Sequence, residues 1–144
     1  MDERTKKDIE DIIALRNLPS EDAKILREWA NRQWRNLEKM TGEPRTEKEL
    51  KNYRHRVSNH AHGQTRRLKC LIHYGGDPPK CACCGESRIE FLTIDHHGVT
   101  PDKRFRSGDN LYRWIIGKNF PEGFRVLCMN CNHYIGRYGW CPHE

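Results

Sequence analysis

The stretch GFRVLCMNCNHYIGR, residues 123–137, joins a β-prone run to a pair of cysteines and then to a polar segment of helical length. Residues 123–127 predict a strand, and residues 130–137 predict a short helix. Cys128 and Cys131 stand at the junction with two residues between them. Two thiolates at this spacing in a tight turn lie as far apart as two corners of a tetrahedral zinc site. The stretch therefore predicts half of a zinc site between a strand and a helix.

The stretch CACC, residues 81–84, carries a second pair with the same spacing. Two such pairs supply the four ligands that a structural zinc ion needs. A redox pair would instead need a βαβ context, which the flanking sequence does not offer. The sequence predicts structural Zn²⁺ bound by Cys81, Cys84, Cys128 and Cys131. Such binding contributes on the order of 10 kcal/mol to folding, so the half after Lys80 is expected to lose its fold without zinc.

The chain holds seven cysteines, and the others lie outside these pairs. Cys83 competes with its neighbours as a ligand, but the spacing favours the outer cysteines of CACC. Cys70 falls on the apolar face of an expected helix, and we expect it to be buried as a small apolar residue. Cys141, in the C-terminal GWCPHE, is a candidate to join His143 in a second metal site.

The stretch IEFLTID, residues 89–95, predicts a second strand, and a polar triplet of Asp95, His96 and His97 ends it. An acid and an imidazole at a strand end can coordinate a hydrolytic metal and hold a general base beside it, although polar residues are also common where strands end. Asn132 opens the predicted helix. Oxygen ligands from Asp95 and Asn132 suit Mg²⁺ or a similar hard ion, whereas thiolates keep zinc at a separate site.

The order Cys-x-x-Cys, Asp-His, Cys-x-x-Cys-Asn resembles the HNH endonucleases, also called His-Me finger or ββα-metal nucleases, and in particular the phage recombination endonuclease VII type. The resemblance covers residues 80–139. It implies that the paired cysteines bind structural zinc. It also implies that Asp95 and Asn132 hold a catalytic Mg²⁺ or Mn²⁺ and that His96 is the general base.

Two positions leave alternatives open within this resemblance. Gly123 stands where many of these motifs have a middle asparagine. Either Asn110 or Asn119 replaces it, or no residue does. His97 allows a shifted register, in which His96 would bind the metal and His97 would be the base.

The N-terminal half shows apolar residues at helical spacing, broken by turns. A first helix is expected around Ile9 and a second from a cap at Ser20. The stretch TEKE, residues 46–49, is typical of a capping box and predicts a third helix, with Gly63 as a candidate interruption. The paired glycines and prolines of HYGGDPPK end that helix. Both tryptophans of the second helix are expected to pack in the core rather than to stack on bases.

Positive charge is concentrated rather than spread. The net charge is +6 and the pI about 9.0, and the stretch from Arg45 to Lys69 has eight basic residues against two acids. This distribution suits a phosphate-facing surface, and an ordinary solvated helix face is the alternative. A basic loop follows at residues 101–110. The side chains predicted to contact DNA are Arg54, Arg56, Arg66, Arg67, Lys69, Arg104, Arg106 and Arg137.

These observations together predict an α+β fold. A helical, basic DNA-binding extension is expected over residues 1–79, and a zinc-bound ββα-metal (HNH) nuclease domain over residues 80–144. The expected activity is metal-dependent hydrolysis of DNA phosphodiester bonds, by nicking or double-strand cleavage. A non-catalytic zinc module that binds nucleic acid is the main alternative, and RNA is a second candidate substrate.

The expected setting follows from composition. Double-stranded or branched DNA is the expected partner, and the protein would act as a monomer or homodimer. The sequence has neither a long apolar run nor a signal-peptide pattern, so we expect no membrane segment and a cytoplasmic location, in the host cell if the protein is phage-encoded.

Overall fold

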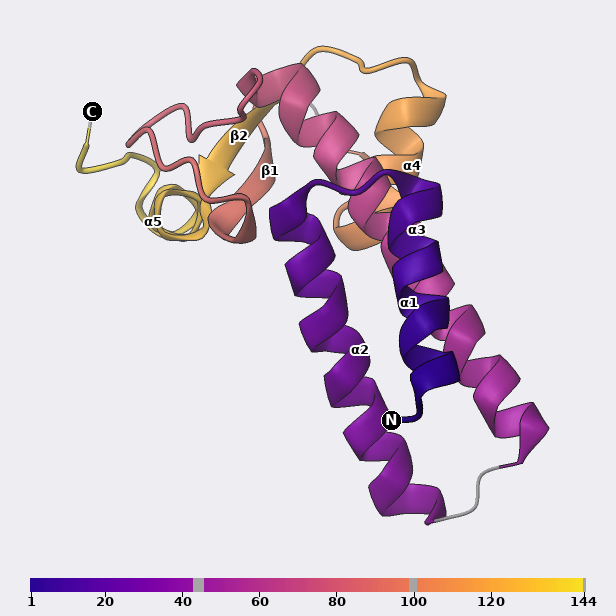
Figure 1. The fold of residues 1–144 in the computed structure, drawn as a ribbon. Helices are drawn as coiled ribbons and strands as arrows, with labels where there is room; N and C mark the ends of the chain where they lie inside the picture. Colours follow the sequence, from indigo (N-terminus) through magenta and orange to yellow (C-terminus); the bar gives the residue numbers. More distant parts are fainter. Residues whose placement is uncertain (43–45, 99–100, 144) are drawn as a thin grey trace. The chain divides into compact units, whose positions relative to one another are not determined.

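Figure 1 shows the computed structural model, which describes residues 1–42, 46–98 and 101–143. The fold is a mostly helical α+β fold, in which a helical N-terminal region precedes a two-stranded antiparallel hairpin with a cysteine cluster near the last helix. The chain divides into compact units at residues 1–65 and 66–144, and the division falls inside one long helix. The functional boundary expected between residues 79 and 80 stays a prediction. Arg45, at the start of the basic stretch, lies outside the described residues.

The first unit is built from helix α1 (Glu3–Arg16), helix α2 (Ser20–Thr41) and the beginning of helix α3 (Glu47–Gly75). Trp34 lies edge-on to the Tyr53 ring, with centroids 5.2 Å apart, and the Tyr53 hydroxyl donates to the Ala30 carbonyl at 2.9 Å. Trp29 is partly buried against the same core, so both tryptophans pack as predicted. The buried core residues are Ile9, Ile13, Ala23, Leu26, Ala30, Trp34, Tyr53, Val57 and Ala61.

The helix ends follow local chemistry, with two differences from the prediction. The capping box is confirmed, because the Thr46 N–H donates to Glu49 Oε2 at 2.8 Å and the Glu49 N–H donates to Thr46 Oγ1 at 3.3 Å. The cap predicted at Ser20 is wrong by one residue: extended Pro19 is the N-cap, and Ser20 is already helical. The interruption predicted at Gly63 is also wrong, since α3 is continuous through it. No helix in the described parts of the chain is long and apolar enough to cross a membrane.

The second unit contains the hairpin. Strand β1 (Leu92–His96) pairs antiparallel with strand β2 (Phe124–Cys128), so that Asp95 lies opposite Arg125 and His96 opposite Phe124. The first strand starts later than predicted because Ile89–Phe91 forms a 3-10 turn before it. Helix α5 (Met129–Tyr138) follows β2 without a loop, close to the predicted bounds.

One face of the hairpin is buried in an apolar core. Helix α4 (Gly108–Gly117) contributes to this core, and Cys70 at the end of α3 is fully buried in it, as predicted. Gly75 passes so close to β2 that a Cβ there would lie 2.8 Å from Val126 Cγ2. The other buried apolar side chains of this core are Leu71, Leu92, Ile94, Leu111, Ile115, Phe124, Val126 and Leu127.

Candidate functional site

The turn after α3 holds the first cysteine pair. The Cys81 N–H donates to the Glu86 carbonyl at 2.9 Å, and the Gly85 N–H donates to the Cys81 carbonyl at 3.1 Å. The Ala82 N–H donates to the Val126 carbonyl at 2.8 Å. This last bond fixes the turn against β2, at whose end the second pair begins.

Four thiols meet at this junction. The ligand atoms of Cys81, Cys84, Cys128 and Cys131 all lie within 4.8 Å of one another. The Cys84 and Cys128 sulfurs are 3.6 Å apart. Two thiolates that each lie about 2.3 Å from a tetrahedral zinc ion are separated by about 3.8 Å, so the observed distance suits zinc. Cys128 is also the N-cap of α5, where its Sγ accepts from the Cys131 N–H at 3.4 Å. The cluster could hold a zinc ion, and its members are the cysteines that the spacing predicts.

Burial and hydrogen bonding oppose each other in their effect on the pKa of Cys81 but act in the same direction on that of Cys131. Burial raises the pKa of Cys81, but hydrogen bonds from the backbone of Cys84, Cys128 and Cys83 outweigh it and lower the pKa to about 6. Burial, followed by the neighbouring Cys128 thiol, raises the pKa of Cys131. The pKa values of these two neighbouring thiols are therefore shifted in opposite directions. A dication displaces thiol protons when it binds, so zinc affinity should rise with pH.

Asp95 and Asn132 are linked to the same face of the hairpin. The Asn132 amide Nδ2 donates to Thr93 Oγ1 at 2.9 Å, and Thr93 Oγ1 donates to the Leu127 carbonyl at 2.9 Å. Alternate residues of a strand share a face, so Asp95 lies on the face that Thr93 presents to α5. Arg125 also lies there, and its Nε donates to Asp95 Oδ2 at 2.9 Å.

His96 lies on the other face of β1. Its ring is edge-on to Phe124 with centroids 5.6 Å apart, and its Nε2 is buried without a hydrogen-bond partner among the described residues. His97 follows β1 directly. Its N–H donates to the Gly123 carbonyl at 2.6 Å, and its side chain is exposed. Within residues 1–42, 46–98 and 101–143, no hydrogen bond or ion pair joins two of the predicted catalytic residues Asp95, His96 and Asn132.

Several arginines predicted to contact DNA make contacts within their own unit. Arg54 Nε lies 2.6 Å from Asp8 Oδ2 in the first unit. In the second unit, Arg66 donates to both Asp109 oxygens, at 2.6 and 2.8 Å. Arg67 donates to the carbonyls of Ile89 and Leu92, which ties the end of α3 to the start of β1. These side chains contribute to folding whether or not they also meet a phosphate.

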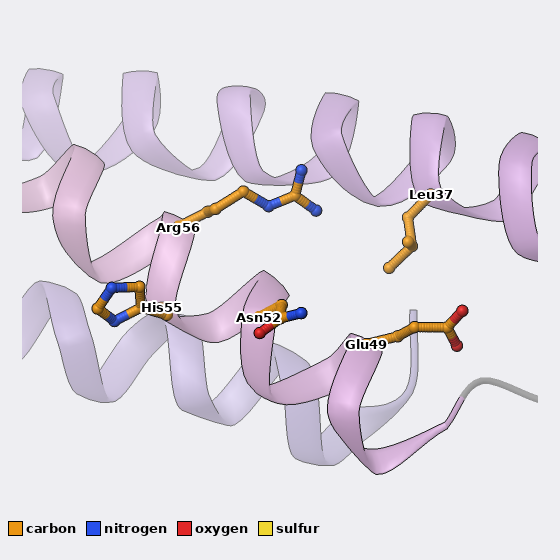
Figure 2. Close-up of a pocket in the computed structure, with 5 residues that line it drawn as sticks. All are labelled: Leu37, Glu49, Asn52, His55 and Arg56. Atoms are coloured by element: carbon orange, nitrogen blue, oxygen red, sulfur yellow. The ribbon is translucent and has the colours of Figure 1, made fainter.

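The other predicted cations are more accessible. Arg56 extends toward Leu37 of α2 across a cavity of about 440 Å³, whose lining residues Figure 2 shows. Lys69, Arg104 and Arg106 are exposed. Arg104 lies 3.8 Å from Asp102, and Arg106 donates to the Pro101 carbonyl at 3.3 Å.

Arg137 lies on the same helix as Asn132, one of the predicted catalytic residues. Exposed on α5, it lines a hollow of about 450 Å³ together with Asn132, His133 and Gly136. The fold therefore places a guanidinium and the Asn132 carboxamide along one open surface.

Sequence reasoning missed two features of the site. Arg125, the partner of Asp95, was not among the predicted residues, although antiparallel pairing of the two predicted strands is the signal that relates them. Cys83 was set aside by spacing, yet its sulfur lies 2.7 Å from that of Cys141. The Cys141 and His143 pair, considered as a second site, lies beside the first cluster.

Comparison of the chain with protein-family models, with curated proteins and with solved structures found no match. The contacts of the thiol cluster and of the hairpin face that carries Asp95 are therefore the basis for a proposed function.

Proposed function

We propose that the protein is a metal-dependent endonuclease that hydrolyses DNA phosphodiester bonds, with β1, β2 and α5 as a ββα-metal core braced by structural zinc. The observation that carries the proposal is the link between Asn132 and Thr93, two residues before Asp95. It brings a carboxamide from the first turn of α5 to the strand face that carries a carboxylate. The cysteine cluster lies at the same helix end and would hold that turn rigid.

The donor atoms suit a hard cation. Because Asn132 Nδ2 faces Thr93, the amide oxygen is left for another partner. Asp95 Oδ2 accepts from Arg125, and Oδ1 remains for a metal. Carboxylate and amide oxygens are preferred ligands of Mg²⁺ and Mn²⁺. When bound, such an ion stabilises the charge that develops on the phosphate and on the leaving oxygen.

His96 is the proposed general base. Water attacks phosphorus, the imidazole nitrogen takes a proton from it, and the bond from phosphorus to the leaving 3′ oxygen breaks; base assistance contributes ~10²- to 10⁴-fold. The support is that Nε2 of His96 has no partner among the described residues. His97 is the second candidate, because its side chain is exposed and it lies two residues after Asp95.

Substrate phosphates would meet the cations around this face. Arg137 shares a hollow with Asn132, so its guanidinium is placed to bind a phosphate beside the proposed ion. Lys69, Arg104 and Arg106 would add contacts farther along the backbone. Such contacts hold the polymer without reading its sequence, so they do not separate DNA from RNA.

A zinc module that binds nucleic acid without cutting it is the second candidate function. The ion pair between Arg125 and Asp95 favours this alternative, since it satisfies the carboxylate without a metal. The burial of His96 Nε2 favours it too, because a base must reach its water.

Cleavage of supercoiled plasmid by the zinc-loaded protein separates these functions. With Mg²⁺ or Mn²⁺, the wild type should produce nicked or linear DNA and Asp95→Asn should not. His96→Ala should lose activity and His97→Ala should keep most of it; the reverse pattern would move the base to His97. DNA binding without cleavage by the wild type would favour the module, and cleavage of structured RNA in place of plasmid would reassign the substrate.

A further inference from the structure

We propose that the C-terminal tail completes a second zinc site directly beside the first, with the thiolate of Cys131 shared between the two ions. The second ligand set is Cys83, Cys131, Cys141 and His143, whose ligand atoms all lie within 4.8 Å of one another. This second site does not depend on the proposed nuclease function. With it, the protein would hold a two-metal cluster rather than an isolated zinc ion bound by four thiolates.

The distances suit a tetrahedral ion. His143 Nδ1 lies 3.4 Å from the sulfur of Cys131 and 3.4 Å from that of Cys141. A sulfur and a nitrogen that bind the same zinc ion are separated by about 3.5 Å, so both distances suit zinc. Cys83 and Cys141 are closer, with sulfurs 2.7 Å apart, whereas two thiolates around zinc are separated by about 3.8 Å. An entering ion would therefore push this pair apart by about 1 Å. Cys83 lies half-buried in the turn of the first cysteine pair.

The tail conformation gives an independent reason. Gly139, with φ +80°, ends α5 in the left-handed conformation and reverses the chain. Three residues can span up to about 10 Å, which equals the rise of about seven helical residues. The tail can thus run back along α5 to its first turn, and Trp140 packs edge-on to Tyr134 with centroids 5.5 Å apart. Cys141 ends fully buried beside Cys131.

The burial of Cys141 contrasts with the exposure of the residues around it. Cys141 is fully buried, while its neighbours Trp140 and His143 are exposed, so apolar contact alone holds this segment weakly. A metal ion bound by Cys141 and His143 would fix the segment against Cys131.

Charge balance allows the second ion. A zinc ion with four thiolates carries a formal charge of about −2. The second ion brings two positive charges, the thiolates of Cys83 and Cys141 cancel them, and neutral His143 adds none. The bridging thiolate of Cys131 is counted once, so the pair has the same net charge as the single site. Cys131 also lies in the first turn of α5, where the helix dipole favours an anion.

Zinc stoichiometry of the full chain tests the proposal. Protein purified with reductant and excess zinc should carry two zinc ions per chain in native mass spectrometry. Cys141→Ser should halve the zinc content, while Cys70→Ala, which removes a buried thiol outside both ligand sets, should leave it unchanged. One zinc per wild-type chain would overturn the proposal.

A second measurement does not depend on the folding of a variant. Wild-type protein loaded with ¹¹³Cd should give two cadmium resonances, because four sulfurs and three sulfurs with one nitrogen shield the ion differently. A single resonance would contradict the shared-thiolate arrangement. A disulfide between Cys83 and Cys141 in the reduced preparation, detected as the loss of two hydrogens, would also overturn it.

Discussion

Replacing Arg125 with methionine should weaken the metal-free protein and strengthen its binding of Mn²⁺. Arg125 Nε donates to Asp95 Oδ2 at 2.9 Å, and the two side chains are only 26% and 17% exposed. A hydrogen bond to a charged partner contributes about 2 kcal/mol, so the free energy of unfolding of the metal-free variant should fall by about that amount. The aliphatic part of methionine preserves most of the packing.

The gain in metal affinity follows from charge. A guanidinium and a divalent ion about 4 Å apart repel by about 8 kcal/mol at an effective dielectric constant near 20. If only about a sixth of this is relieved when the guanidinium is removed, Mn²⁺ binding tightens by about tenfold. The variant should therefore be less stable without metal but bind Mn²⁺ more tightly. If the pair were only a structural salt bridge, stability would fall and Mn²⁺ binding would not change.

Urea unfolding with and without saturating MnCl₂ measures both effects. Because a ligand of the native state stabilises it in proportion to RT ln(1 + [L]/Kd), Mn²⁺ should stabilise Arg125→Met more than the wild type. Arg113→Met is the matched control, since Arg113 pairs with Asp109 at 2.9 Å on the surface of α4. If Mn²⁺ stabilised Arg125→Met and the wild type equally, the proposed ion would not bind beside Arg125.

Three further outcomes are expected. His96→Ala should slow plasmid cleavage by ~10²- to 10⁴-fold, and a smaller loss than that of His97→Ala would be the contrary result. Chelation of zinc should destabilise residues 66–143 by an amount on the order of 10 kcal/mol, seen as lost amide-exchange protection there, whereas protection retained throughout would contradict a structural role for zinc. Burial raises the pKa of Tyr53 from 10.0 to about 12. The stability that the neutral hydroxyl contributes is therefore full below pH 10 and is lost as the pH rises through 12. Tyr53→Phe should remove this pH dependence from the free energy of unfolding, and an unchanged alkaline unfolding profile would contradict the expectation.

The cysteine spacing and the capping box could be predicted because each depends on residues close in sequence. Cys81 with Cys84, and Cys128 with Cys131, each fit a single turn, and Thr46 with Glu49 forms one reciprocal cap. Interactions between residues this close in sequence do not depend on which distant elements pack around them.

Gly63 shows where local propensity fails. A glycine costs about 1 kcal/mol in a helix relative to alanine, yet α3 continues through it because the neighbouring turn is packed. Ala61 is fully buried, and Gln64 is buried with its amide 3.5 Å from the Asp22 carbonyl. Tertiary packing outweighs the propensity of one residue.

The roles of the arginines could not be read from a run of positive charge. Arg54, Arg66 and Arg67 differ from exposed Lys69 only in the residues that other elements bring near them. Those partners come from distant positions, so helical spacing alone cannot identify them. The same applies to Cys83, which meets Cys141 only because Gly139 reverses the chain.

Anomalous scattering from crystals soaked in manganese would locate the proposed catalytic ion. We predict a manganese peak bonded to the oxygens of Asp95 and Asn132, at about 2.2 Å from each, and separate from the zinc peak at the thiol cluster. A hairpin face without manganese, with Asp95 still paired to Arg125, would contradict the proposed nuclease site.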